Sequence, residues 1–321
     1  MRHHLYPLLT DSSTCIYADM ADQFAFRPTG STTACLIAIL KEITDLLKRE
    51  RYVRLIALDF TRAFDTVRIS SLFSKMAVLP IQDSIYNWLL QFFSGRSHYT
   101  VFEGLSSAER SINASIIQGS VTGPIAYDIN ASDVHPTNHK NTLSKYADDG
   151  YLIVPASQED SIDSEIDHIG EWAKSNNLRL NPAKSTEIII YSKGSTSIIM
   201  PPPHPSIRRV TNIKILGVRF NNNLSMSQHI TEIAAKSAQT LYALKILRSH
   251  GLSGKNLHQV CRSLLINRLT YASPSWVGFT TAEDKDRLQR IINRAKRWKL
   301  DGGIELPSIS KLFELADTVI F

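Results

Sequence analysis

The chain has few cysteines, and their spacing excludes two kinds of site. Only Cys15, Cys35 and Cys261 occur among its 321 residues. This wide spacing provides neither paired zinc ligands nor a disulfide framework. We therefore expect the protein to work in a reducing compartment.

Long apolar runs are also missing. The longest, residues 34–40, is far shorter than the ~20 residues that a membrane-spanning helix needs. The apolar part of residues 1–9 is too short and too interrupted for a secretory signal. The sequence therefore predicts a soluble, intracellular protein with no membrane partner. It has no clear basic import cluster that would decide between the nucleus and the cytoplasm.

The net charge of +6 is unevenly distributed. Residues 230–300 contain 13 Lys or Arg and 4 Asp or Glu, a net charge of +9, which leaves −3 for the rest of the chain. The last long helical pattern has an apolar stripe from Leu288 to Trp298. A row of arginines lies beside this stripe and is predicted to contact nucleic-acid phosphates; its members are Arg287, Arg290, Arg294 and Arg297. The alternative is that these arginines form a solvated basic face.

Two adjacent carboxylates stand between two strand-like segments. In Tyr146-Ala147-Asp148-Asp149, the acidic pair follows a polar segment and precedes the apolar run 151–154. Because like charges repel and strand side chains alternate between faces, such a pair is easiest to hold at a turn beside a cation. Carboxylate oxygens suit Mg²⁺. Taken alone, the pattern is also typical of an ordinary hairpin turn.

A third carboxylate follows another apolar run. Residues 55–58 predict a buried strand that ends at Asp59 and leads into a helix-like segment. Two-metal phosphoryl transfer needs carboxylates from separate segments to bridge two cations about 3.5–4 Å apart. Asp59, Asp148 and Asp149 are therefore the predicted catalytic and metal-binding residues.

Six motifs occur along the chain in a definite order. They are residues 23–32, 59–67, 118–124, 146–149, 178–184 and 215–218. In these motifs the chain resembles the reverse transcriptase domain of non-LTR (LINE-type) retrotransposons, whose corresponding motifs are, in the same order, the fingers motif, motifs A, B, C and D, and the primer grip. The resemblance implies an RNA-directed DNA polymerase from a mobile element, with two Mg²⁺ ions as cofactors and Mn²⁺ as a substitute.

The resemblance also implies nucleotide contacts in motifs A and B. Phe64 would pack against the sugar of the incoming nucleotide and exclude a 2′-hydroxyl, although a core aromatic would look the same in the sequence. Gln118 and Gly119 would approach a sugar or base edge through an amide and a backbone without Cβ. A loop with Ser120 as the N-cap of the following helix is compatible with that reading.

Two basic side chains, Lys184 and Arg27, are further candidates for nucleotide binding. By resemblance, Lys184 would donate a proton to pyrophosphate or neutralise it. Arg27 would contact phosphate or nucleic acid through its permanently charged group. A solvated lysine and a surface ion pair are the alternatives.

The alternation of helical and strand patterns predicts an α+β fold. The resemblance implies a right-hand polymerase palm, an antiparallel sheet with packed helices, with partial fingers and palm in residues 1–225 and a helical, basic thumb in residues 226–321. We expect helices at 33–50, 70–94 and 162–176, strands at 55–58, 151–154 and 187–191 and between 96 and 117, and a surface loop at 201–205.

Some family features are missing or altered. Family members begin further upstream, with a fingers hairpin that clamps the triphosphate, and many carry an endonuclease domain. The chain starts after that hairpin and ends on an apolar segment, so we expect a truncated copy or a partial gene product. Ala25 stands where glycine is usual, and Asp128 where an apolar or amide residue is expected.

The sequence thus predicts a reverse transcriptase with an RNA template, a DNA primer and deoxynucleoside triphosphates as partners. It gives no oligomeric state, and nuclear action is implied by the family alone. An inactive nucleic-acid-binding remnant is the main alternative. A metal-dependent nuclease is a weaker alternative, because motif B and Phe64 would have no function in such an enzyme.

Overall fold

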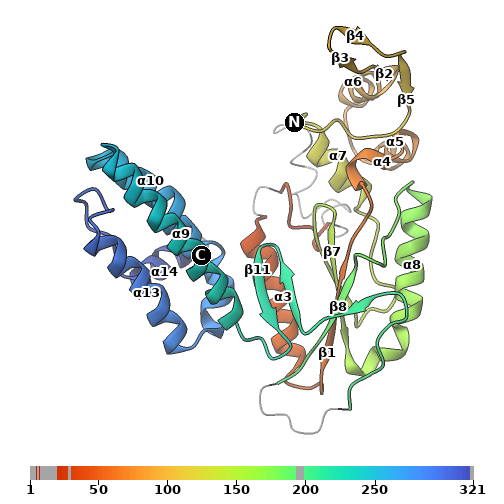
Figure 1. Cartoon of the computed structure of the whole chain (residues 1–321). Helices are drawn as coiled ribbons and strands as arrows, with labels where there is room; N and C mark the ends of the chain where they lie inside the picture. The colour runs from red at the N-terminus through yellow and green to blue at the C-terminus, as the bar shows by residue number, and fades with distance from the viewer. Residues whose placement is uncertain (1–4, 6, 8–19, 28–29, 193–198, 319–321) are drawn as a thin grey trace. The chain divides into compact units, whose positions relative to one another are not determined.

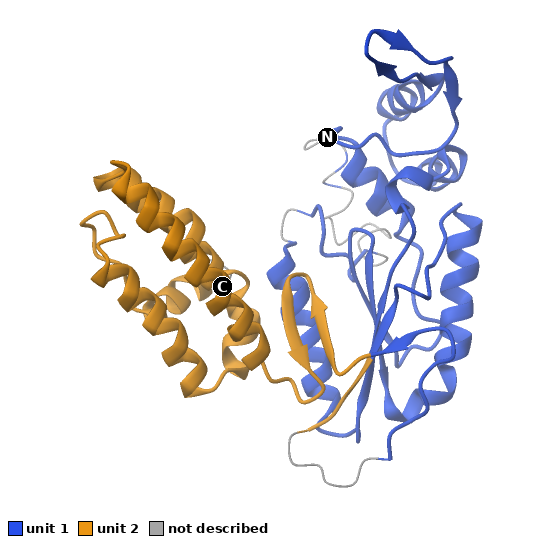
Figure 2. Cartoon of the chain, viewed as in Figure 1, with its two compact units in different colours: residues 1–187, 198–209 blue, residues 188–197, 210–321 orange. Residues whose placement is uncertain are grey.

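The computed structural model of the chain describes residues 5, 7, 20–27, 30–192 and 199–318. The chain divides into two compact units, coloured separately in Figure 2. Unit 1 comprises residues 1–187 and 198–209, and unit 2 comprises residues 188–197 and 210–321. These units are defined by packing alone. The expected division into fingers and palm (residues 1–225) and thumb (residues 226–321) stays a prediction.

A five-stranded sheet forms the centre of unit 1 (Figure 1). The strand order is β6-β7-β1-β8-β9; β7 pairs antiparallel with both β1 and β6, whereas β8 and β9 pair in parallel. Five of the six residues of β1 are buried, as expected for a strand covered on both faces. The bounds are β1 Val53–Leu58, β6 Thr142–Tyr146, β7 Asp149–Pro155, β8 Thr186–Ile190 and β9 Arg208–Arg209.

Helices cover this sheet. Helix α8, Ile162–Ser175, buries its apolar stripe against side chains of β1, β6 and β7. Helix α3, Thr32–Leu46, contacts β6 and β7 and lies on the other side of the sheet from α8 (Figure 1). The α+β palm predicted from the sequence is confirmed, with the sheet mixed rather than purely antiparallel.

A buried ion pair joins two of these strands. Arg54 on β1 donates hydrogen bonds to Glu187 on β8 and to Glu159, and both Arg54 and Glu187 are almost completely buried. Glu187 also accepts a 2.8 Å hydrogen bond from the Nε of Arg209 on β9. Three strands are therefore connected by charged side chains inside the protein.

A second apolar cluster surrounds Tyr127 and Phe93. The single helix expected at 70–94 is wrong: it is two helices, separated around Pro80. Proline has no N–H to donate and disfavours helical backbone at the residue before it, so the helix ends upstream. The helices of this region are α4 Ala63–Thr66, α5 Ile69–Ala77, α6 Asp83–Phe93 and α7 Gly123–Asn130, and a 3-10 turn spans Ala156–Ser161.

Two small antiparallel ladders project between α6 and α7 (Figure 1). Glu103 and Gly104 make a tight turn with positive φ at both positions, typical of a type I′ hairpin. Around this tip Tyr99, Phe102 and Leu105 are 61%, 71% and 77% exposed. The strands are β2 Arg96–His98, β3 Val101–Phe102, β4 Leu105–Ser106 and β5 Arg110–Ile112.

Unit 2 combines a β-hairpin with a bundle of helices (Figure 2). Trp276 is completely buried and packs edge-to-face on His229 and Phe313. Beyond the hairpin, the described residues contain no strand, as predicted. The elements are β10 Asn212–Ile215, β11 Val218–Asn221, α9 Ser227–Ser249, α10 Gly254–Cys261, a π-helical segment Arg262–Ile266, α11 Asn267–Thr270, α12 Ser273–Trp276, a 3-10 turn Val277–Phe279, α13 Ala282–Arg297 and α14 Ile309–Asp317.

None of the helices in the described part of the chain is long and apolar enough to cross a membrane. Cys35 and Cys261 are buried free thiols. Cys15 lies outside the described residues.

Candidate active site

The first predicted carboxylate, Asp59, follows the end of β1 directly. Strands β1 and β7 pair antiparallel as far as Leu58 and Gly150. Continuing this register by one residue brings Asp59 opposite Asp149. The structure therefore brings motif A and motif C to the same edge of the sheet.

The second carboxylate, Asp148, lies in the turn of the β6–β7 hairpin. Tyr146 pairs with Asp149, so Ala147 and Asp148 form a two-residue loop. Ala147 has a φ of +54°, in the left-handed region that such turns use. Asp148 and Asp149 are exposed, as a site for an external ligand requires.

A buried glutamine holds this turn. The Oε1 of Gln23 accepts hydrogen bonds of 3.1 Å from the backbone amides of Ala147 and Ala25. Gln23 is only 2% exposed. Sequence reasoning included Gln23 in the fingers motif but gave it no role, because its partner lies far away along the chain.

Motif D also contacts the end of β1. The backbone amide of Asp59 donates to the Ser185 hydroxyl at 3.1 Å, and the Asp59 carbonyl accepts from the Asn181 amide at 2.8 Å. Phe60 forms a β-bridge with Leu180. The backbone of the first carboxylate is thus fixed from the motif D side.

The carboxylates influence one another electrostatically. The pKa of Asp149 is raised above its usual 3.8, mainly by desolvation of the carboxyl where protein surrounds it, and then by the negative charges of Asp148 and Asp59. A hydrogen bond from Tyr151 acts in the opposite direction. Burial and the charge of Asp149 raise the pKa of the Cys35 thiol to about 12. Negative charge is therefore concentrated at this edge of the sheet.

Such a concentration of carboxylates fits a hard divalent cation, which would relieve the repulsion. In the conformation of the described residues, no three Asp, Glu, His or Cys side chains converge tightly enough to form a metal site. The donor chemistry and the mutual repulsion are in place, and the predicted ligation by Asp59, Asp148 and Asp149 remains a prediction.

Phe64 lies on α4 beside this edge, within an aromatic cluster. Its ring stacks on Tyr127 with centroids 4.4 Å apart and meets Phe26 edge-to-face at 6.5 Å. Phe64 is half-buried, so one part of the ring packs in the protein while another part stays accessible. This position is compatible both with a core aromatic and with a contact to a nucleotide sugar.

The sequence profile of the reverse transcriptase (RNA-dependent DNA polymerase) family matches residues 6–220, well over half of the chain. The chain belongs to this family. The profile covers all six motifs and therefore includes the sheet edge that carries Asp59, Asp148 and Asp149.

Curated relatives of the chain come from insect mobile elements. The probable RNA-directed DNA polymerase from transposon X-element of Drosophila melanogaster is 27% identical over 292 residues, which is 86% of this chain and 31% of that protein. The RNA-directed DNA polymerase from mobile element jockey of the same species is 26% identical over 224 residues, 66% of this chain and 24% of that protein. The resemblance to non-LTR retrotransposon enzymes is confirmed, and the chain spans about a third or less of these relatives.

Solved structures with the same fold include telomerase from Candida tropicalis. The complex with a TWJ fragment of telomeric RNA has a TM-score of 0.54 at 14% identity, covering 99% of this chain and 53% of the telomerase chain. The apo enzyme has a TM-score of 0.52 at 15% identity, covering 99% and 59%. At this identity the likeness concerns the fold.

In motif B, Gln118 is exposed and donates a 2.7 Å hydrogen bond from Nε2 to Asp65. Gly119 has a φ of +80° and open space where a Cβ would stand. Helix α7 begins at Gly123 with Thr122, not Ser120, at the N-cap position. The Ser120 hydroxyl nevertheless accepts a 2.9 Å hydrogen bond from the Gly123 amide, so it supports the first turn as expected.

Arg27 and Lys184, the two basic residues predicted to bind nucleotide, differ in their surroundings. Arg27 donates to the carbonyls of Met20 and Gln23 at 2.5 and 3.2 Å, which fixes the loop that carries Gln23. Lys184 is exposed beyond the motif D turn. The predicted contacts of both with a nucleotide remain predictions.

Asp128, which departs from the family pattern, is completely buried on α7. Neither of its carboxylate oxygens has a hydrogen-bond partner. Burial raises its pKa well above the usual value, and the charges of Lys145 and Arg27 only partly oppose that shift. Lys145 is itself buried and donates to Asp22 and to the carbonyls of Ala131 and Val134.

The predicted arginines occupy one helix of unit 2, α13. The predicted apolar stripe is buried from Leu288 to Ala295, whereas its last member, Trp298, is the C-cap residue and is half-buried. Arg287 donates to Thr231 at 3.1 Å, and Arg294 lies 5.8 Å from the centre of the Trp298 ring. The other two, Arg290 and Arg297, are exposed.

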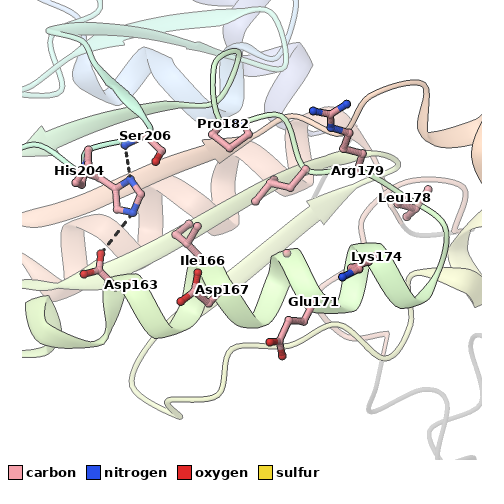
Figure 3. Close-up of a pocket in the computed structure, with 13 residues that line it drawn as sticks. Asp163, Ile166, Asp167, Glu171, Lys174, Leu178, Arg179, Pro182, His204 and Ser206 are labelled. Atoms are coloured by element: carbon pink, nitrogen blue, oxygen red, sulfur yellow. Dashed lines mark hydrogen bonds and ion pairs between the residues drawn. The ribbon is translucent and has the colours of Figure 1, made fainter.

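A large cavity lies elsewhere in unit 1. It has a volume of about 1040 Å³ and lies between α8 and the segments around residues 178–182 and 204–206 (Figure 3). At one end the Nε2 of His204 lies 3.4 Å from Asp163. None of the three motif carboxylates lines this cavity. The position of the three carboxylates at one edge of the sheet, rather than this cavity, therefore identifies the candidate site.

Proposed function

We propose that the chain is an RNA-directed DNA polymerase that extends a DNA primer on an RNA template. The observation that carries the proposal is the position of Asp59, Asp148 and Asp149 at one edge of the palm sheet, within a chain of the reverse transcriptase family. These carboxylates would hold two Mg²⁺ ions, for which Mn²⁺ could substitute. The ions would supply charge neutralisation for transfer of the nucleotidyl group to a primer 3′-hydroxyl.

The protein residues have distinct tasks in this proposal. The backbone hydrogen bonds to Ser185 and Asn181 fix Asp59, and the Gln23 side chain fixes the turn that carries Asp148. Fixed ligands need little reorganisation when charge develops, which is the main protein contribution to phosphoryl transfer.

Other side chains would position the deoxynucleoside triphosphate. Phe64 would select the deoxynucleotide by excluding a 2′-hydroxyl. Gln118 and Gly119 would approach the sugar or base, and Lys184 and Arg27 would contact phosphates. The exposure of Gln118, Gly119 and Lys184 and the half-buried ring of Phe64 support these assignments.

Primer extension with Asp148→Asn tests the catalytic proposal. Asparagine keeps the shape of the side chain but removes its charge, so Mg²⁺-dependent extension should fall by roughly 100-fold or more. Asp167→Asn is the control, because Asp167 is an exposed carboxylate on α8 outside the site. Extension by Asp148→Asn at the rate of the unaltered chain would contradict the assignment.

A second candidate function is nucleic-acid binding without catalysis. It is favoured by one specific observation, the exposed arginines that lie beside the buried apolar stripe of α13. In this case the exposed Arg290 and Arg297 of α13 would bind backbone phosphates in a salt-dependent manner. Binding of template–primer that weakens with salt and with Arg290→Gln/Arg297→Gln, but no extension, would support this function over the first.

A further inference from the structure

The large cavity of unit 1 is a groove beside helix α8. We call it the α8 groove: it lies between α8 and residues 178–182 and 204–206 (Figure 3). Its wall on α8 extends from Asp163 to Lys174, a rise of about 16 Å at ~1.5 Å per residue. The volume of about 1040 Å³ lies at the upper limit of the ~300–1,000 Å³ of small-ligand sites. Length and volume therefore fit a peptide segment better than a small molecule.

A glycine lies in the wall of the groove, in the interior of α8. Glycine is the poorest helix former after proline, because it loses the most backbone freedom on folding. A Cβ at Gly170 would meet no atom within 4 Å, so packing within the chain does not require glycine there. Ile166, Leu180 and Pro182 give the groove apolar surface. The glycine thus leaves the middle of the groove open, where the backbone of a bound segment can approach α8 closely.

Three carboxylates follow one another along the same wall. Asp163, Asp167 and Glu171 are spaced four residues apart on α8, and all line the groove. Asp163 is paired with His204 at 3.4 Å, whereas the other two side chains have no ion pair or hydrogen bond within the described residues. Like charges four residues apart destabilise a helix. The helix dipole favours Asp163 in the first turn, but it does not account for Asp167 and Glu171 further along.

Basic side chains lie at the other end of the groove. Lys174 is in the last turn of α8, and Arg179 is on the facing segment (Figure 3). Neither side chain has an ion pair or hydrogen bond in the part of the chain that the structure describes. A nucleic-acid backbone is negative along its whole length, so the three carboxylates would repel it. A peptide segment with a basic residue at one end and an acidic residue at the other complements both ends of the groove.

We propose that the α8 groove binds a peptide segment of a partner protein. A basic side chain of the segment would pair with Asp167 and Glu171, and an acidic side chain with Lys174 and Arg179. Between them, apolar side chains would pack over Gly170. None of the carboxylates assigned to catalysis lines the groove, so the proposal does not depend on the proposed function.

Peptide selection on the full chain tests the proposal. The probe is a library of random dodecapeptides displayed on phage and selected on the immobilised chain, with excess soluble Gly170→Trp protein as competitor. Because tryptophan fills the open middle of the groove, the competitor removes peptides that bind elsewhere. We expect enriched peptides with a basic residue at one end and an acidic residue at the other. In anisotropy titrations, their binding to Gly170→Trp should be about tenfold weaker or more.

A charge reversal tests the predicted order of charges. Asp167→Lys should weaken binding of the enriched peptides about threefold to tenfold. Asp160→Lys, at an exposed carboxylate outside the groove, and Ser164→Trp, at an exposed position of α8 outside it, are the matched controls and should leave binding unchanged. Thermal unfolding shows whether each variant is folded, and Gly170→Leu replaces the tryptophan variant if that variant does not fold.

Several results would overturn the proposal. If no peptide is enriched, or if the enriched peptides bind Asp167→Lys as tightly as the unaltered chain, the groove does not recognise a peptide in the way proposed. Displacement of an enriched peptide by a single-stranded decanucleotide would make the groove a nucleic-acid site. A dimer in sedimentation experiments that Gly170→Trp abolishes would make a second copy of the chain the occupant. Because no extension is measured, an inactive polymerase would leave the groove assignment intact.

Discussion

The side-chain oxygen of Gln23 accepts a 3.1 Å hydrogen bond from the backbone amide of Ala147, at the turn that presents Asp148. The same oxygen accepts from Ala25, so one buried side chain ties the segment before α3 to the motif C turn. Motif C therefore depends on a residue far from it in sequence.

Gln23→Leu should impair catalysis more than substrate binding. Leucine fills similar space but accepts no hydrogen bond, so the backbone amides of Ala25 and Ala147 lose their partner and the turn loosens. We expect kcat for primer extension to fall about tenfold with KM for the nucleotide nearly unchanged, in steady-state assays under conditions where the variant is folded. Gln239→Leu, an exposed glutamine on α9, should behave as the unaltered chain. A rise in KM alone would show that Gln23 does not position the carboxylate turn.

Asp149→Asn should uncouple stability from divalent metal. Without metal, the variant loses one of the mutually repelling charges, so its melting temperature should equal or exceed that of the unaltered chain. Mg²⁺ should raise the melting temperature of the unaltered chain by binding the folded state, and raise that of the variant less. Thermal unfolding with Mg²⁺ and with EDTA measures both effects. Equal Mg²⁺ effects in the two proteins would exclude Asp149 as a ligand.

Asp128→Asn should stabilise the protein at neutral pH. The raised pKa of Asp128 means that the folded state keeps a proton that the unfolded state releases above about pH 4. This contribution makes the unaltered chain less stable as pH rises toward the folded-state pKa, and stability is regained as pH falls.

Denaturant unfolding between pH 5 and 8 checks that sign. The gain from Asp128→Asn should be about 1–3 kcal/mol at pH 7 and should shrink toward pH 5. Asp167→Asn, on the exposed face of α8, should show no such trend. A variant that is less stable than the unaltered chain at every pH would mean that the Asp128 carboxylate makes favourable interactions in solution.

Arg54→Met should destabilise the palm. It removes a fully buried cation while Glu187 stays buried between the strands, with Arg209 and the His204 amide as its remaining partners. Losing one member of a buried pair costs about 3–5 kcal/mol, and the Arg209 contact places our expectation near 3 kcal/mol. Lys41→Met, in an exposed pair with Asp45, should change the urea midpoint little. Equal midpoint shifts in the two variants would contradict this account.

Much of the palm could be predicted because its signals are local. The apolar run before Asp59 and the acidic pair before the run 151–154 each lie within a few residues, and pairing of their strands brings them together. The break at Pro80 also has a local signal, proline, but the single helix expected over 70–94 overlooked it.

The missing parts depend on contacts between distant segments. Gln23 and Ala147 are 124 positions apart, and Arg54 and Glu187 are 133 positions apart. An arginine inside an apolar strand gives no sign of which carboxylate it meets. The open space beside Gly170 likewise becomes visible only when the atoms around it are known.

The hairpin tip formed by Val101, Phe102 and Leu105 has a practical consequence. Its short strands expose apolar side chains to solvent, and the ladder has only two strands. Exposed strand edges and apolar surface favour association between molecules. Concentrated samples will therefore tend to self-associate through this tip, more so in sulfate or phosphate salts, which strengthen apolar association. A charged residue in place of Phe102 should reduce this self-association in every measurement above.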